Sequence, residues 1–99
     1  MRQRIDTDAL KRGHPIEQVV ADYGIALRRS GRALVGRCPF HDDRRHPNLH
    51  LYPSPDPARD GYCCYRCGAH GDVVDFVARL AGLGFLAAVE RLADSRPPA

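Results

Sequence analysis

Apolar side chains recur at the spacing of an amphipathic helix near the start of the chain. Four of them fall at i, i+3, i+4 and i+7, so they share one face of a helix. Pro15 suits the first position of that helix, and Gly24 ends it. A shorter helix is expected over residues 5–12, so the N-terminal helices fall within residues 1–24. The apolar face consists of Ile16, Val19, Val20 and Tyr23.

The same periodicity returns near the other end of the chain, within residues 71–95. Asp72 is a suitable N-cap, and Asp75 places a carboxylate in the first turn, where the helix dipole favours it. Gly82 and Gly84 separate this helix from a last one, which we expect to end near Ser95. The apolar stripes of the two helices are Val73, Phe76, Val77 and Leu80, followed by Phe85, Val89 and Leu92.

Between the helical ends, residues 25–70 contain short alternating segments bounded by glycine and proline, which is typical of strands. A turn is expected at residues 30–32, and the proline-rich residues 53–57 form a loop or turn. The expected strands are residues 25–29, 33–37, 48–52 and 61–64. The chain is therefore expected to have an α+β fold, a small antiparallel sheet flanked by N-terminal and C-terminal helices.

The chain has 99 residues and a mass of 11.0 kDa, enough for one small domain, which we take to span residues 1–99. Its 43% hydrophobic and 27% charged residues are typical of a soluble globular protein. No apolar run approaches the roughly 20 residues of a membrane helix, and the N-terminal residues alternate in charge instead of forming a secretory signal. We therefore expect a cytoplasmic protein with no membrane partner.

Two short motifs follow the ends of predicted strands, Cys38-Pro39-Phe40-His41 and Cys64-Tyr65-Arg66-Cys67. In each, two residues separate the candidate ligands, and at this spacing a tight turn presents both donors to one tetrahedral Zn²⁺. The 22 residues between the motifs are enough for the third strand and its loop to bring them together. The pattern predicts a zinc site formed by Cys38, His41, Cys64 and Cys67.

Other residues compete for these roles. Cys63 is an alternative to Cys64, but it lies three residues from Cys67 and points from the opposite face of the strand, so we expect it to pack. The alternative for the four predicted ligands is a structural role without metal, as buried apolar cysteines and a core histidine. Three further histidines stand in no paired spacing and are expected to be solvated or capping residues: His46, His50 and His70.

Three thiolates and one imidazole fill all four positions around Zn²⁺, which leaves none for a reactive water. We therefore expect one structural Zn²⁺ in a small zinc ribbon, an antiparallel sheet closed by two zinc knuckles. The binding free energy of such a site is on the order of 10 kcal/mol, comparable to the whole stability of a small domain. The apo protein should be largely unfolded.

The net charge of +3 is small, but the basic residues are unevenly placed. Fourteen of the fifteen are arginine, and residues 28–66 contain eight arginines against four aspartates. Aromatic rings beside guanidinium groups are typical of surfaces that bind single-stranded nucleic acid. The alternatives are a solvated surface for the arginines and core packing for the rings, which we expect for Phe40. The rings in this segment are Phe40, Tyr52, Tyr62 and Tyr65.

The two motifs, with Gly68-Ala69-His70-Gly71-Asp72 after the second, resemble the Cys-His-Cys-Cys zinc ribbon at the N-terminus of bacterial and phage DNA primases. The likeness covers most of the chain. In that family the ribbon contacts single-stranded template DNA and helps a separate polymerase domain choose where a primer begins. The resemblance implies the same role here, with a primase catalytic domain or a replicative helicase as partner. By position it implies DNA contacts at Arg28, Arg29, Arg32 and Arg44, to which we add Arg37, Arg45, Tyr65 and Arg66.

The chain departs from the family pattern after the first motif. Asn48 replaces the usual serine after Pro47, and one residue is inserted around Arg45 and His46. Nothing after Ala93 resembles the polymerase domain, and no acidic triplet for nucleotidyl transfer is present, so we expect an accessory module without catalytic residues. A self-standing copy suggests a phage, plasmid or integrated mobile element.

A second hypothesis is a protein interaction module. In this interpretation the helical end, residues 72–93, docks on a replication or transcription protein, and the basic residues are incidental. It predicts weak DNA binding and an exposed apolar strip on the last helix.

Overall fold

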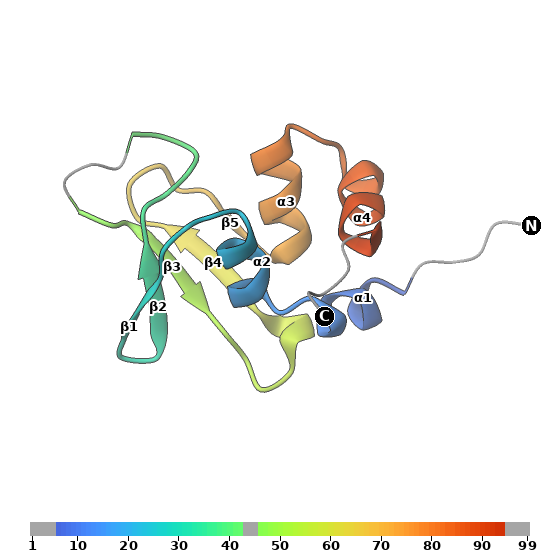
Figure 1. Cartoon of the computed structure of the whole chain (residues 1–99), viewed down its shortest axis with the longest axis horizontal. Helices are drawn as coiled ribbons and strands as arrows, with labels where there is room; N and C mark the ends of the chain where they lie inside the picture. Colours follow the sequence, from blue (N-terminus) through green and yellow to red (C-terminus); the bar gives the residue numbers. More distant parts are fainter. Residues whose placement is uncertain (1–5, 43–45, 95–99) are drawn as a thin grey trace, which may run out of the picture.

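The computed structural model describes residues 6–42 and 46–94. These residues form the predicted α+β fold, a five-stranded antiparallel sheet with four α-helices and a short 3-10 turn (Figure 1). The helical elements are α1 (Thr7–Gly13), α2 (Ile16–Asp22), η1 (Pro57–Arg59), α3 (Val73–Ala81) and α4 (Phe85–Asp94). The strands are β1 (Arg28–Ser30), β2 (Ala33–Gly36), β3 (Leu49–Tyr52), β4 (Gly61–Cys64) and β5 (His70–Gly71).

Each strand pairs with its neighbour in sequence, in the order β1-β2-β3-β4-β5. Gly31, whose φ is +60°, allows the tight turn between β1 and β2. Because β2 and β4 are both antiparallel to β3, they run in the same direction and end at the same end of the sheet. Cys38 follows β2 and Cys64 ends β4, so this topology brings the two cysteine motifs together.

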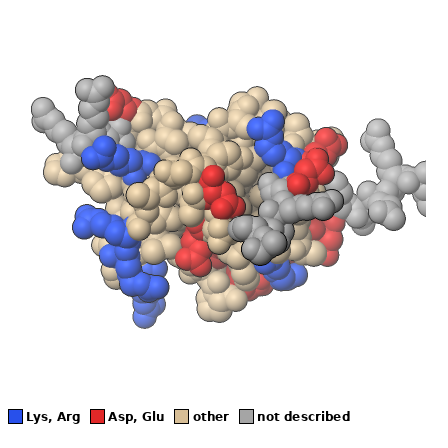
Figure 2. Space-filling model, in the orientation of Figure 1, with Lys and Arg blue, Asp and Glu red and all other residues tan. Residues whose placement is uncertain are grey.

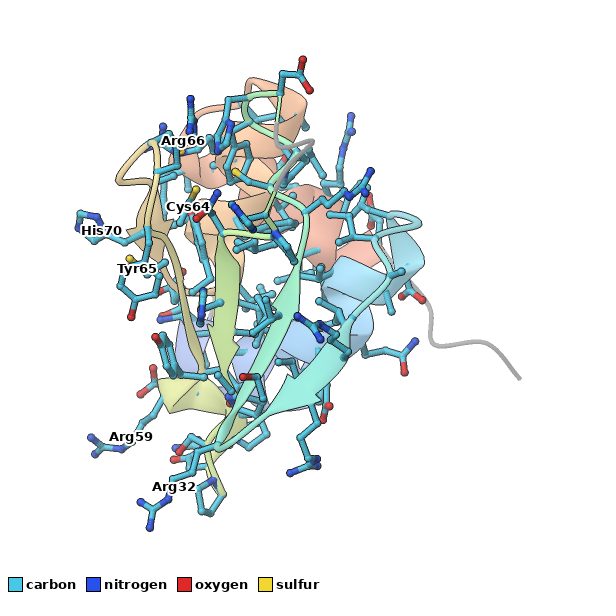
Figure 3. All side chains as sticks on the ribbon, turned by 90° about the vertical axis from the view of Figure 1, so that its left-hand side faces the viewer. Arg32, Arg59, Cys64, Tyr65, Arg66 and His70 are labelled. Atoms are coloured by element: carbon cyan, nitrogen blue, oxygen red, sulfur yellow. The ribbon has the colours of Figure 1, made fainter. Side chains whose placement is uncertain are left out.

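The helices cover one face of the sheet, and none of the described helices lies on the other, although Ala33 and Val35 of β2 are buried there (Figures 1 and 3). Phe76 of α3 is fully buried against the covered face. The residues that β3 and β4 turn to this core are each at most 3% exposed: Leu49, Leu51, Tyr62 and Cys64. None of the described helices combines the length and the apolar character needed to cross a membrane.

The first strand differs from the prediction. Residues 25–29 were expected to be extended and paired, whereas β1 begins at Arg28. Residues 25–27 instead pass over Gly36 of β2, where a Cβ atom would lie 2.7 Å from the carbonyl oxygen of Ala26. Ile25 and Leu27 pack against the core from this crossing segment. Their apolar character therefore reflects core contact rather than strand pairing.

The helices begin close to where the sequence places them. Pro15 is the N-cap of α2 and not its first residue, a difference of one position. The α3 helix begins with a capping box, because the Asp72 carboxylate accepts the N–H of Asp75 at 2.9 Å and the Asp75 carboxylate accepts the N–H of Asp72 at 3.0 Å. This reciprocal pair fixes the start of α3 directly after the second metal motif.

Candidate metal centre and open sheet face

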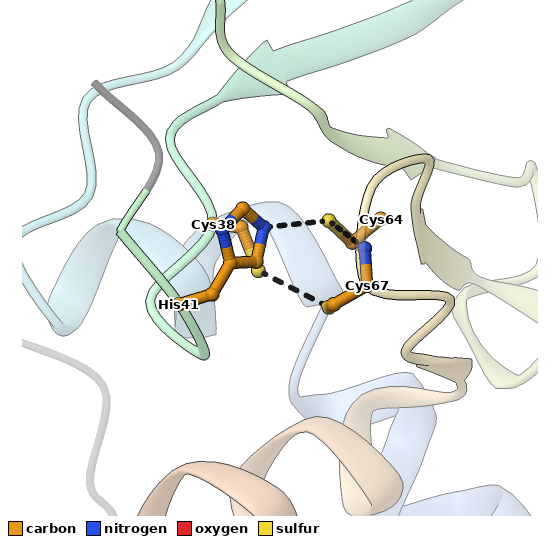
Figure 4. Close-up of side chains that lie close together, drawn as sticks. All are labelled: Cys38, His41, Cys64 and Cys67. Atoms are coloured by element: carbon orange, nitrogen blue, oxygen red, sulfur yellow. Dashed lines mark hydrogen bonds between the residues drawn. The ribbon is translucent and has the colours of Figure 1, made fainter. Parts of the chain in front are cut away.

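The four predicted ligands converge at one end of the sheet, with their donor atoms within 4.8 Å of one another (Figure 4). Cys38 Sγ and Cys67 Sγ are 3.9 Å apart, and His41 Nε2 is 3.2 Å from Cys64 Sγ. A tetrahedral Zn²⁺ with Zn–S bonds of about 2.3 Å separates its sulfur ligands by roughly 3.8 Å. The spacing and the donor set therefore fit one zinc ion.

Each motif folds as a tight turn whose backbone amides point at the sulfur atoms. The N–H of Phe40 donates to Cys38 Sγ at 3.4 Å, and the N–H groups of Arg66 and Cys67 donate to Cys64 Sγ at 3.4 and 3.5 Å. Such bonds stabilise negative charge on a thiolate. Gly68, with φ of +78°, completes the second turn, and its N–H donates to the carbonyl of Cys64. The backbone hydrogen bonds within each motif thus position the two ligands that the motif contributes.

His41 reaches the site with its ring oriented by a backbone group. Its Nδ1 lies 3.1 Å from the carbonyl oxygen of Asp42 and donates to it when the proton is on Nδ1. Nε2, which faces the three sulfur atoms, then carries the lone pair that a metal requires. The carbonyl of Asp42 therefore selects the tautomer that binds zinc.

The two most buried thiols differ in acidity. Burial raises the pKa of Cys38 to about 12. Burial acts in the same direction on Cys64, but the N–H of Cys67, the His41 ring and the N–H of Arg66 outweigh it and lower the pKa of Cys64 to about 6. Cys64 is therefore the more acidic of the two thiols, and zinc binding requires both as thiolates.

Cys63 lies outside the metal cluster, on the opposite side of β4 from Cys64. It is half-buried and stands directly across from His50 on β3 and His70 on β5. The ring nitrogens Nδ1 of these two histidines lie near the carbonyl oxygens of Asn48 and Gly68. Among the described residues, only the predicted four form a metal-binding group.

The uncovered side of the sheet, here called the open face, is crossed by a row of paired residues, one from each strand. These residues are Arg28, Val35, His50, Cys63 and His70. Exposed aromatic rings lie beside this row. Tyr52 is 40% exposed and Tyr65 is 63% exposed, and their hydroxyls are hydrogen-bonded to each other. The His50 ring meets the Tyr65 ring edge-on at a centroid distance of 4.6 Å.

Arginines lie at both ends of the open face (Figure 3). Arg32 and Arg59 lie near the β1–β2 turn, and Arg66 lies beside Tyr65 in the second motif. In Figure 2 the basic side chains at the left lie over the sheet, and acidic side chains lie mainly over the middle and the helices.

The remaining predicted contact residues differ in position. Arg28 is part of the open face, but Arg29 pairs with Leu34 and so belongs to the opposite face at the sheet edge. Arg37 is exposed between β2 and the first motif. Arg44 and Arg45 lie outside the described residues.

Sequence reasoning named Tyr52 among the rings of the basic segment but not among the DNA contacts, and it gave neither His50 nor Arg59 that role. Tyr52 and His50 are brought to Tyr65 only by the pairing of β3 with β4. Arg59 is placed near Arg32 by the connection between these two strands. Phe40 and Tyr62, by contrast, pack with Phe76 in the core, with ring centroids 5.4 and 5.3 Å from it. The alternation of β3 is the signal that places His50 and Tyr52 on the side away from the core.

A small antiparallel sheet closed by two cysteine-containing turns around three thiol ligands and one imidazole defines a zinc ribbon with a structural metal centre. The CHC2 zinc finger family model matches residues 2–97, and the chain belongs to that family. The family and the geometry agree on one structural Zn²⁺.

Several relatives of the chain are DNA primases. The primase of Mycobacterium tuberculosis is 40% identical over 90 residues, which cover 90% of this chain. Those of Chlamydia trachomatis and Geobacillus stearothermophilus are 38% and 35% identical over 86 residues. The crystal structure of the Aquifex aeolicus primase, with its zinc-binding and RNA polymerase domains, matches with a TM-score of 0.74 and 28% identity over 92% of this chain and 21% of that one.

The chain spans 13% of the length of the primases named above. The similarity therefore covers the zinc-binding part of these proteins.

Proposed function

We propose that the chain is the zinc-binding module of a DNA primase and that it binds single-stranded template DNA on its open face. The primer is made by a catalytic domain outside these 99 residues, and the module contributes no catalytic residue. The family and the primase relatives support the general role.

The observation that carries the DNA-binding proposal is the pair of exposed rings, Tyr52 and Tyr65, on a sheet face without helical cover. Exposed aromatic rings on a sheet stack unpaired bases, and a duplex hides those base faces. Each stacked base is worth about 1–3 kcal/mol. The rings therefore favour single strands over duplex DNA.

Charge supports the same surface. Arg28, Arg32, Arg59 and Arg66 are exposed around the rings, and none of them forms an ion pair with a described residue. Guanidinium groups there neutralise phosphates and release counterions, which makes binding weaken as salt rises. For single strands, each neutralised phosphate contributes about 0.7 to the slope of log affinity against log salt.

The proposal is tested by fluorescence anisotropy of the zinc-loaded protein with single-stranded and duplex oligonucleotides at several salt concentrations. Tyr65→Ala should weaken single-strand binding by roughly 5- to 150-fold through lost stacking. Arg28→Ala combined with Arg32→Ala should lower the salt slope. Arg91→Ala, on α4, removes the same kind of charge far from the sheet and should leave binding unchanged.

Equal binding of single-stranded and duplex DNA, or a Tyr65→Ala variant that binds like wild type, would contradict the proposal.

A protein-docking function has one specific observation in its favour. Phe85 and Leu86 at the start of α4 are 57% and 68% exposed, as the interaction hypothesis predicts. Burying the exposed parts of these two side chains would contribute about 2–4 kcal/mol to an interface. If Phe85→Ser with Leu86→Ser lowers primer synthesis by a primase catalytic domain in trans without changing DNA affinity, α4 acts as a docking surface.

A further inference from the structure

A cavity of about 430 Å³ opens at the β5 edge of the sheet, between β5 and α3. His70, labelled in Figure 3, lines the cavity and also ends the row of residues across the open face. The rest of the lining lies on the helix-covered side of this edge, so a single strand that crosses the open face would reach the cavity by passing around β5. Its polar lining comes from Tyr62, His70, Asp75 and Arg79.

Tyr62 supplies a buried hydroxyl to this lining. The residue is 3% exposed, and its ring packs edge-on against Phe76. The hydroxyl makes no hydrogen bond with any described residue. The Arg79 guanidinium lies close enough to act on it, because it opposes the rise in the pKa of Tyr62 that burial causes. Buried polar groups are almost always partnered in native proteins, so a ligand in the cavity would complete the hydrogen bonding of this hydroxyl.

Arg79 and Asp75 present complementary groups beside that hydroxyl. They are one helical turn apart on α3, the spacing at which ion pairs form, yet no salt bridge joins them. The Arg79 guanidinium carbon lies instead 5.7 Å from the centroid of the Phe40 ring. Asp75 uses Oδ2 for the capping box, which leaves Oδ1 without a described partner. The cavity thus offers both donors and an acceptor.

We propose that this cavity receives a guanine base from the single strand on the open face, an inference that rests on the proposed function. Arg79 donates to O6 and N7, and Asp75 accepts from N1–H and the N2 amino group. The buried Tyr62 hydroxyl lines the same cavity and bonds to the O6 side of the base.

The cavity lining carries both a positive and a negative side chain, and this favours a neutral base over a phosphate. A phosphate meets the Asp75 carboxylate at close range, and this repulsion disfavours an anion. Arginine recognises guanine through the paired acceptors O6 and N7. Guanine also offers two adjacent donors on its Watson–Crick edge, a match for a carboxylate that adenine, cytosine and thymine do not provide. A base splayed from a single strand exposes both edges for such readout.

The test uses the zinc-loaded protein and twelve-nucleotide strands of dT that carry one central dG, dA, dC or dT. We expect the dG strand to bind roughly tenfold more tightly than the others. Tyr62→Phe removes only the hydroxyl and should abolish most of this preference without lowering the thermal midpoint of the free protein. Arg79→Lys keeps the positive charge but not the planar fork, and it should also lose the preference.

Base analogues test the individual contacts. A central 7-deazaguanine lacks the N7 acceptor and should lose the part of the preference that depends on Arg79. Inosine lacks the N2 amino group and should lose the part that depends on Asp75.

The outcomes are separable. If no strand binds, the proposed function fails and this inference fails with it. If all four strands bind equally, DNA binding stands and the guanine site is wrong. If Arg79→Lys binds every strand as wild type does, Arg79 is only a phosphate contact, and the inference is overturned. A Tyr62→Phe variant that melts earlier with its base preference intact shows a purely structural hydroxyl.

Discussion

The carboxylate of Asp60 accepts a hydrogen bond from the backbone N–H of Ile16, with Oδ2 3.0 Å from the nitrogen. Its other oxygen accepts the N–H of Ser54 at 2.6 Å, and the residue is only 4% exposed. One buried side chain between β3 and β4 therefore caps the first turn of α2 and fixes its own loop. It joins the N-terminal helices to the sheet.

Replacing Asp60 with alanine leaves two amides without their acceptor in a site closed to water. We expect Asp60→Ala to lower the free energy of unfolding of the zinc-loaded protein by about 3 kcal/mol. Asp60→Asn, which keeps one carbonyl acceptor, should lose less. Urea denaturation followed by circular dichroism measures both, with Glu90→Ala on exposed α4 as the control. A loss below about 0.5 kcal/mol for Asp60→Ala would show that the caps contribute little.

Zinc removal should unfold the chain, because the metal joins the ends of β2 and β4. We expect a chelator to abolish the cooperative thermal transition, since such sites contribute on the order of 10 kcal/mol. Cys64→Ser should bind no stoichiometric zinc. Cys63→Ser is the matched control next in sequence and should keep one zinc ion per chain, measured by atomic absorption. If the Cys63→Ser variant lost its zinc, the assignment of Cys64 rather than Cys63 as the ligand would be wrong.

A salt bridge between α1 and α3 gives a defined pH dependence. Lys11 Nζ lies 2.8 Å from the Asp72 carboxylate. The hydrogen bond to Asp72 raises the pKa of Lys11 above 10.5. Burial opposes ionisation of Asp72, but Lys11 and the N–H of Asp75 lower the pKa of its carboxyl below 3.8. Because the lysine pKa is raised and the aspartate pKa is lowered, the pair stabilises the fold fully between these two limits.

Lys11→Met should therefore lower the free energy of unfolding by about 0.5–1 kcal/mol, the value for a partly exposed pair. This loss should be the same from pH 6 to pH 9. The difference from wild type should shrink above about pH 10.5, as Lys11 loses its proton. It should also shrink as acid protonates Asp72. Thermal melts of both proteins over the alkaline range, with the zinc content measured at each pH, locate the first limit. A difference that already falls between pH 7 and pH 9 contradicts the assigned pair.

Gly36 is the one glycine where a side chain would strike backbone from another segment. A Cβ atom added there would lie 2.7 Å from the Ala26 carbonyl oxygen, which is shorter than a van der Waals contact between carbon and oxygen. We expect Gly36→Ala to destabilise the protein by about 1–3 kcal/mol, because residues 25–27 must move off the core. Gly13→Ala is the control, since nothing lies within 4 Å of its Cβ position. Equal stability of the two variants would contradict the close crossing.

Periodicity and motif spacing predicted the helices and the four metal ligands, because both depend on residues close in sequence. β5 was not predicted, since His70 and Gly71 are too few to show a pattern and pair only because the second motif turns the chain back along β4. The crossing at residues 25–27 was interpreted as a strand for a related reason. Apolar residues that contact the core give the same sequence pattern whether they lie in a paired strand or in an unpaired crossing segment.

The open face needed the structure for the same reason. Tyr52 and Tyr65 are thirteen positions apart, and only the register of β3 with β4 places their hydroxyls together. The cap by Asp60 depends on a contact across 44 positions. Contacts of this range carry no local signature in one sequence.

The order of the strands bears on how quickly the protein folds. Every strand from β1 to β5 pairs with its sequence neighbour, so the sheet forms through short loop closures, a topology associated with rapid folding. The metal ligands meet only after β2 and β4 have both paired with β3. Because the zinc-free chain does not hold this sheet, we expect the hairpins to form only transiently until the ion binds both motifs and stabilises them. In a cell, zinc supply rather than the conformational search would then set how fast the native protein accumulates.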